Sequence, residues 1–134
     1  CYNLTSIKIP NLVKSIDTGA FKGCISLTSL TIPNSVTSIG YNAFCECSSL
    51  STLVLPNNIT KINMSAFANC KGLTEIVIPK SVEVINCEAF YNCSNLRKVI
   101  FNNPKTIIGY KAFYGCLNLS EETKRNLAIL KYKI

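Results

Sequence analysis

Hydrophobic and polar residues follow one another in a pattern that repeats every 23 residues along the chain. Within each repeat, two apolar residues two positions apart, such as Leu30 and Ile32, have the spacing of a strand that turns one side to a core. A proline such as Pro33 then ends the strand, because it lacks the backbone donor that a continuing strand needs. The pattern predicts this strand, a bend, a second short strand through 36–39, and a tight or single-turn helical segment at Ala43 and Phe44.

The repeat divides the chain into five coils, 1 to 5, which comprise residues 1–23, 24–46, 47–69, 70–92 and 93–115. A cysteine opens each coil and an Ala-Phe pair lies near its end. These two columns hold Cys1, Cys24, Cys47, Cys70, Cys93 and Cys116, and Phe21, Phe44, Phe67, Phe90 and Phe113. A fixed period of this length indicates one supersecondary unit that is copied and stacked. Since a single coil cannot bury its own apolar face, we expect a solenoid with a continuous core that contains the phenylalanine rings.

Two further columns are rich in residues that accept a positive φ, and they predict bends. One column reads Asp17, Gly40, Asn63, Asn86 and Gly109, and the other reads Gly23, Glu46, Asn69, Asn92 and Gly115. The repeat pattern ends at Leu119. Ser120 then has the character of an N-cap, and Glu121 and Glu122 are acids that suit a first helical turn. We therefore expect a solenoid over residues 1–119 and, within 120–134, a helix over 121–131 that caps the solenoid or links it to another segment.

The motif L-x2-[IL]-x-[IL]-P-x2-[VI]-x2-I-x3-AF-x2-C occurs at residues 27–47, 50–70 and 73–93. It resembles the leucine-rich repeat of the BspA type, and the resemblance extends over residues 1 to about 119. The fifth copy departs from the motif, because Asn102 replaces the proline and Lys105 replaces the valine. The resemblance implies an α/β, β-rich solenoid: a right-handed leucine-rich-repeat superhelix of 23-residue coils with a parallel sheet on one face. It also implies a surface-exposed protein of a host-associated bacterium or parasitic protist, active in adhesion to matrix proteins or other cells.

Composition argues against catalysis and cofactor chemistry. The chain has no histidine, so nucleophilic catalysis assisted by histidine is absent, and its seven acids form no recurring pair. We expect no catalytic residue, no metal site and no cofactor. The ladder cysteines next to the phenylalanines fit buried thiols, with disulfides between neighbouring coils as the alternative. Cys45 and Cys87 lie outside this ladder and are the better candidates for exposed or reactive thiols.

The net charge of +7 suggests an acidic partner, such as nucleic acid, a glycan or an anionic surface. The basic residues, however, occupy many different positions of the repeat and form no ladder. We therefore interpret them mainly as a solvated surface, and keep weak binding to sulfated glycan as an alternative. A nucleic-acid partner is not expected.

The outward positions of the main strand carry the candidate binding site. Stacked coils place one outward residue above another, which predicts an exposed apolar stripe of Val54, Val77 and Ile100. We define the sheet face by Lys8, Thr31, Val54, Val77, Ile100, Thr52, Glu75 and Lys98. An exposed apolar stripe on a sheet is often an interaction site, although plain β-propensity or contact with another subunit explains it equally well. Tyr91 and Tyr114 share a column, are expected to stack, and are secondary candidates for an interface.

These observations favour a non-catalytic, protein-binding module of a cell-surface or secreted protein, with adhesion to a host matrix or cell-surface protein as its function. Two alternatives remain: a structural spacer that displays a neighbouring domain, and a basic surface that binds sulfated glycan. Self-association through the open ends of the solenoid or through the apolar stripe is also compatible with the sequence. No run of residues has the length and apolar character of a transmembrane segment.

Overall fold

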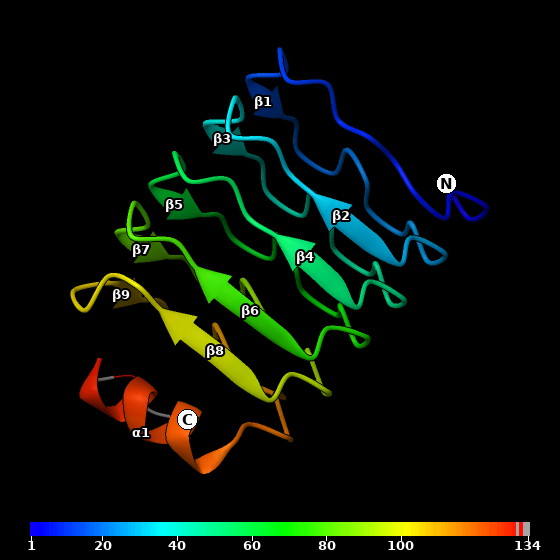
Figure 1. Ribbon diagram of the computed structural model, residues 1–134. Coiled ribbons are helices and arrows are strands. Elements are labelled where there is room, and N and C mark those ends of the chain that lie inside the picture. Colours follow the sequence, from blue (N-terminus) through cyan, green and yellow to red (C-terminus); the bar gives the residue numbers. More distant parts are fainter. Residues whose placement is uncertain (131, 133–134) are drawn as a thin grey trace.

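The computed structural model describes residues 1–130 and 132 and shows a solenoid of stacked coils that ends in one helix (Figure 1). The main strands of coils 2 to 5 are β2 (Ser29–Thr31), β4 (Thr52–Val54), β6 (Glu75–Ile78) and β8 (Lys98–Phe101). The second row of short strands consists of β1 (Ser15–Ile16), β3 (Ser38–Ile39), β5 (Lys61–Ile62), β7 (Val84–Ile85) and β9 (Ile107–Ile108). Both rows pair in parallel at a constant offset of one coil, so the predicted β-rich solenoid is confirmed.

The two rows are not continuous sheets. In the first row β2 pairs with β4 and β6 pairs with β8, but β4 and β6 form no ladder. In the second row the interruption falls one coil earlier, between β3 and β5. There the side-chain amide of Asn63 donates to the carbonyl oxygen of Ile39 over 2.6 Å. The parallel sheet expected on one face is therefore four short sheets on two sides of the solenoid.

A third backbone ladder connects every pair of neighbouring coils. It runs through the Ala-Phe segment, where the N–H of Phe44 donates to Ala66 and that of Phe67 donates to Ala89 over 2.8 and 2.9 Å. This segment is a series of tight turns rather than a helix. Because the same bonds recur at each level, the five phenylalanine rings lie above one another with centroids 5.2–5.6 Å apart. Four of these rings are completely buried, and Phe21 at the end of the stack is partly buried, which confirms the predicted core.

One predicted bend column is confirmed and the other is wrong. Positive φ occurs at the column Gly23, Glu46, Asn69, Asn92 and Gly115, as expected, and at the column Gly19, Asn42, Ser65, Glu88 and Lys111. The second bend thus lies two residues later than predicted. Gly40 and Gly109 of the column that was predicted to bend are required for another reason. A Cβ at either position would collide with the backbone of the preceding coil, so glycine permits the close approach of the two coils.

The fifth coil keeps its register despite its unusual first turn. Lys105 is exposed, and the next residue, Thr106, is buried in place of the missing valine. Its hydroxyl donates to the carbonyl oxygens of Val82 and Asn103, each over 3.0 Å. Since β9 still pairs with β7 at the usual offset, the substitution is absorbed within the turn.

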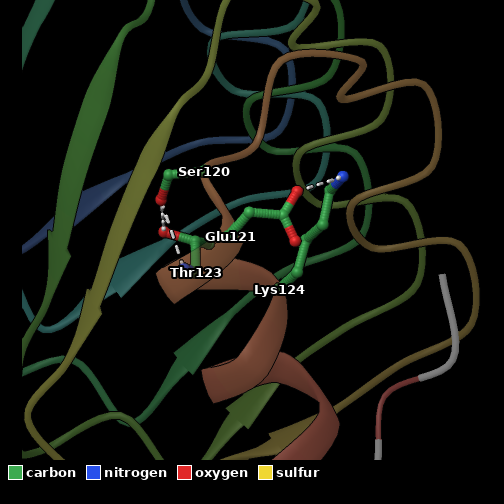
Figure 2. A network of polar contacts seen from close by, with 4 residues as sticks. All are labelled: Ser120, Glu121, Thr123 and Lys124. Carbon is green, nitrogen blue, oxygen red and sulfur yellow. Dashed lines mark hydrogen bonds and ion pairs between the residues drawn. The ribbon is translucent and has the colours of Figure 1, made fainter.

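The C-terminal helix α1 (Glu121–Ile129) packs against β8 and buries Leu127 completely. Ser120 is its N-cap: the side-chain oxygen accepts from the N–H of Thr123, and Lys124 pairs with Glu121 over 3.3 Å (Figure 2). The hydroxyl of Thr123 accepts from the N–H of Val99, and that of Tyr132 accepts from the N–H of Phe113. The N–H groups of Val99 and Phe113 belong to coil 5 and point away from coil 4. In the middle of the solenoid, such N–H groups donate to the next coil, so here Thr123 of α1 and Tyr132 take the place of that coil as acceptors.

The helix predicted over 121–131 ends at Ile129 in the structure, and residue 131 lies outside the described residues. The division into a solenoid of residues 1–119 and a C-terminal segment of residues 120–134 remains a prediction.

Candidate binding surface

The structure places all the sheet-face residues at exposed positions, and the strand register brings most of them together. Thr31 pairs with Val54 across β2 and β4, and Val77 pairs with Ile100 across β6 and β8. Lys8 occupies the equivalent position in coil 1, where the chain forms no main strand. The predicted geometry of the surface is therefore present, and its use in binding is a separate question.

The apolar stripe of Val54, Val77 and Ile100 is exposed by 50%, 47% and 38%, although each residue belongs to a strand. Valine and isoleucine are favoured in strands whether or not they bind a partner. The residues that precede the stripe residues, Leu53, Ile76 and Val99, are buried, so buried and exposed side chains alternate as in any sheet with one face on the core. The stripe borders a shallow depression of about 290 Å³ at the interruption between β4 and β6. A partner side chain could enter this depression without displacing any described part of the chain.

Charged side chains flank the stripe on one side. Glu75 and Lys98 are register partners on β6 and β8, but they do not form an ion pair. Within residues 1–130 and 132, the pair of Lys124 and Glu121 is the one salt bridge present. Glu75 and Lys98 are thus available to charged groups of a partner at the rim of an apolar contact, the arrangement that is common in protein interfaces.

The expected stacking of Tyr91 and Tyr114 is confirmed, with ring centroids 5.6 Å apart. The sequence analysis missed Lys111, whose ammonium lies 5.3 Å from the ring centroid of Tyr114 and 5.2 Å from that of Tyr110. It also missed a second column on a different side of the coils, formed by the exposed Tyr41, Met64 and Tyr110 and the half-buried Cys87. The 23-residue period contains the signal for this column, because these residues occupy one position in four successive coils.

The cysteine ladder combines both alternatives that the sequence left open. Cys1 and Cys24 form a disulfide with Cα atoms 4.9 Å apart, whereas Cys47, Cys70, Cys93 and Cys116 are free and buried. Burial raises the pKa of the Cys47 thiol to about 11 and that of Cys116 to about 12, since a thiolate loses its hydration there.

The expectation for Cys45 is wrong and that for Cys87 holds only in part. Cys45 is 6% exposed because it packs inside the turn, and burial, aided by the nearby charge of Glu46, raises its pKa. Cys87 is of intermediate exposure. Over the described part of the chain, no group of three or more histidine, cysteine or acidic side chains is placed to hold a metal ion.

Stacked parallel coils, a regular apolar core and an exposed strand face define a leucine-rich-repeat protein. The chain belongs to the BspA-type leucine-rich repeat family, because the family model for the BspA type leucine-rich repeat region matches six copies over residues 1–120. Leucine-rich-repeat proteins of this kind are generally binding modules without catalytic activity. The comparison with curated protein sequences gives no match.

Several solved structures share the fold. A leucine-rich cell surface protein from Faecalibacterium prausnitzii is 33% identical with a TM-score of 0.83, over 94% of this chain and 34% of that protein. A leucine-rich repeat protein from Bacteroides capillosus is 37% identical with a TM-score of 0.65, over 75% of this chain and 78% of that protein. A third, from Eubacterium ventriosum, is 26% identical with a TM-score of 0.73, over 84% of this chain and 37% of that protein.

The chain thus spans about a third of the length of the Faecalibacterium protein. The family indicates a repeat module for protein interaction, and the Faecalibacterium relative is itself a cell surface protein. Within the described residues, the structure contains no helix of the length and apolarity that crossing a bilayer requires.

Proposed function

We propose that the chain is a non-catalytic adhesion module of a cell-surface or secreted protein, and that it binds another protein through its sheet face. The observation that carries the proposal is the apolar stripe of Val54, Val77 and Ile100, which remains exposed across three coils. Burial of these three side chains in an interface would contribute roughly 25 cal/mol for each Å² of apolar surface removed from water. The extracellular location and the host matrix or cell-surface partner are part of this proposal.

The shape of the surface supports a protein partner. The depression beside the stripe is lined by residues of β4, β6 and β8 and of the segments that lead into β4 and β6. Glu75 lines it and Lys98 is the register partner of Glu75 on β8, so the two offer one charge of each sign, which suits a partner with mixed charges and fixes its orientation. A partner bound mainly through the stripe would show little dependence on salt, because apolar contacts are not screened.

The test compares the wild-type chain with the double variant Val54→Asp/Val77→Asp for binding to immobilised fibronectin and laminin, two matrix proteins. We expect the double variant to bind at least tenfold more weakly, because two carboxylates would be buried without partners. Ile107→Asp is the matched control, since Ile107 is 66% exposed on β9 in the other strand row. Equal binding of the wild type and the double variant would remove the stripe from the interface, and no binding to either protein would favour a spacer.

Self-association through the stripe is a second outcome of the same design. Sedimentation of the wild type and the double variant over a range of concentrations distinguishes it. A dimer that the double variant abolishes would identify a second copy of the chain as the partner.

A further inference from the structure

A hollow of about 590 Å³ lies apart from the sheet face, on the side of coils 4 and 5 where one coil passes into the next. Its walls include the ring of Tyr114, the side chain of Leu117, and the polar residues Lys71, Asn92 and Ser94. The hollow shares none of its lining residues with the depression beside the stripe. It is therefore a separate candidate site.

The polar side chains of this hollow are not used by the fold. The main-chain carbonyls of Lys71 and Ser94 accept the side-chain amides of Asn95 and Asn118 over 2.7 Å each. The ammonium of Lys71, the amide of Asn92 and the hydroxyl of Ser94, in contrast, bond to no other described residue. Three polar side chains without hydrogen-bond partners among the described residues thus line one hollow, with donors from all three and acceptors from Asn92 and Ser94.

Gly115 makes room for one of these groups. A Cβ at Gly115 would collide with the carboxamide of Asn92, so only glycine leaves that amide its present position. Gly115 also has a φ of +80° and Asn92 a φ of +56°, so both positions favour residues that tolerate the left-handed region. The missing side chain at Gly115 and the backbone conformation at both positions thus leave the Asn92 carboxamide room beside the hollow.

A second positive charge lies on the aromatic wall. Tyr114 is 53% exposed, and the ammonium of Lys111 lies over its ring. Lys111 occupies the same column as Glu88 one coil earlier, yet neither Lys71 nor Lys111 forms an ion pair with a described acid. The hollow therefore combines an amide, a hydroxyl, an exposed tyrosine and the cation of Lys71, and Lys111 adds a second positive charge beside Tyr114.

We propose that this hollow binds an acidic saccharide, that is, a sugar ring with a carboxylate or a sulfate group. The amide of Asn92 and the hydroxyl of Ser94 match the hydroxyl groups of a sugar, and Lys71 matches its negative charge. Tyr114 and Leu117 offer apolar contact to its C–H groups. A peptide fits less well, because the main chain around the hollow already bonds within the solenoid: the N–H of Asn92 donates to Tyr114 and that of Cys116 donates to Phe113. The proposal does not depend on the apolar stripe.

The test is titration of the purified chain with three probes: a heparin-derived tetrasaccharide for sulfate, sialyllactose for carboxylate, and lactose as the neutral reference. Binding is followed by isothermal calorimetry at fixed ionic strength. We expect one of the acidic probes to bind and lactose to bind at least tenfold more weakly. Lys71→Gln and Asn92→Asp should each weaken binding of the acidic probe by tenfold or more.

Two controls keep the result interpretable. Lys80→Gln removes a similarly exposed charge outside the hollow and should leave binding within twofold of the wild type. Val54→Asp/Val77→Asp should leave saccharide binding unchanged, so failure of this proposal and failure of the protein-binding proposal give different results. Absence of binding for both acidic probes, equal binding of lactose, or an equal loss in Lys80→Gln and Lys71→Gln would each overturn the proposal. Thermal unfolding of each variant verifies that it is folded.

Discussion

The thiol of Cys70, which opens coil 4, donates to the carbonyl oxygen of Phe44 near the end of coil 2 over 3.2 Å. The same bond joins Cys47 to Phe21, Cys93 to Phe67 and Cys116 to Phe90 over 3.2–3.3 Å. A thiol fits this position because it is small enough to pack beside the phenylalanine stack and still has a weak donor. The cysteine column therefore joins the start of each repeat from Cys47 on to the phenylalanine of the coil two before it by a hydrogen bond, whereas Cys24 bonds covalently to Cys1.

Replacement of this thiol should have a small cost. For Cys70→Ala we expect a loss of about 1 kcal/mol in the free energy of unfolding, from a small cavity and a weak hydrogen bond. The Phe44 carbonyl keeps its bond from the N–H of Cys47, so it is not left without a donor. Urea unfolding gives the number, with the half-buried Cys87→Ala as the control. A loss above about 3 kcal/mol would show that the thiol does more than these contacts indicate.

The position of a phenylalanine in the stack should determine the cost of its truncation. Phe67 is completely buried between two rings, whereas Phe21 has one ring neighbour and is partly exposed. Phe67→Ala should therefore lose about 3–5 kcal/mol, and Phe21→Ala clearly less. Thermal or urea unfolding of both variants tests the difference. Equal losses would mean that Phe21 at the end of the stack is as well packed as Phe67 in its middle.

Stability should fall in alkaline solution because of the buried thiols. Burial raises the pKa of Cys47 from 9.0 to about 11 and that of Cys116 to about 12. In this interval the unfolded chain ionises while the folded chain retains its protons, so the stabilising difference is complete below pH 9 and is lost as the pH rises toward the folded values. Each thiol lowers the free energy of unfolding by at most about 1.4 kcal/mol per pH unit.

Urea midpoints at several pH values between 7 and about 10.5 measure this effect. Lysine and tyrosine also titrate near the upper limit, so Cys47→Ala supplies the comparison. Its stability should decline less steeply than that of the wild type above pH 9. Parallel curves would exclude the thiol as a cause of the alkaline loss.

The C-terminal helix should stabilise coil 5. Leu127 is completely buried in the core, so Leu127→Ala should cost about 2–5 kcal/mol. Ser120→Ala removes the N-cap acceptor and should cost about 1 kcal/mol. Hydrogen exchange locates the effect, since the N–H of Val99 and that of Phe113 depend on the capping residues. Unchanged protection of both amides in Leu127→Ala would contradict the role of the cap.

The repeat period was sufficient to predict the strands, the phenylalanine stack and the exposed stripe. These features depend on which residues recur at one position, and stacking brings such residues together whatever their detailed conformation. The stacking of Tyr91 and Tyr114 followed from the same reasoning. The candidate sheet face could therefore be defined by residue number from the sequence.

Features that depend on the backbone within one coil could not be predicted in this way. Positive φ at Ser65, Glu88 and Lys111 involves residues that rarely adopt it, so composition pointed to the wrong column. Burial of Cys45 depends on the direction of one side chain within a turn. The period places Asn92 and Gly115 in one column, but the hollow beside Tyr114 required atomic positions, because its volume and lining depend on how side chains of several columns are arranged.

The two ends of the described solenoid differ in how their core and backbone are covered. At the C-terminal end, the hydroxyls of Thr123 and Tyr132 accept amide protons that a following level would have used. At the other end, Leu12 is 86% exposed and the core residues Ile7, Val13 and Phe21 are only partly covered. A second copy therefore cannot extend the coil-to-coil hydrogen bonds beyond α1 at Val99 and Phe113, because both amides already have acceptors within the chain.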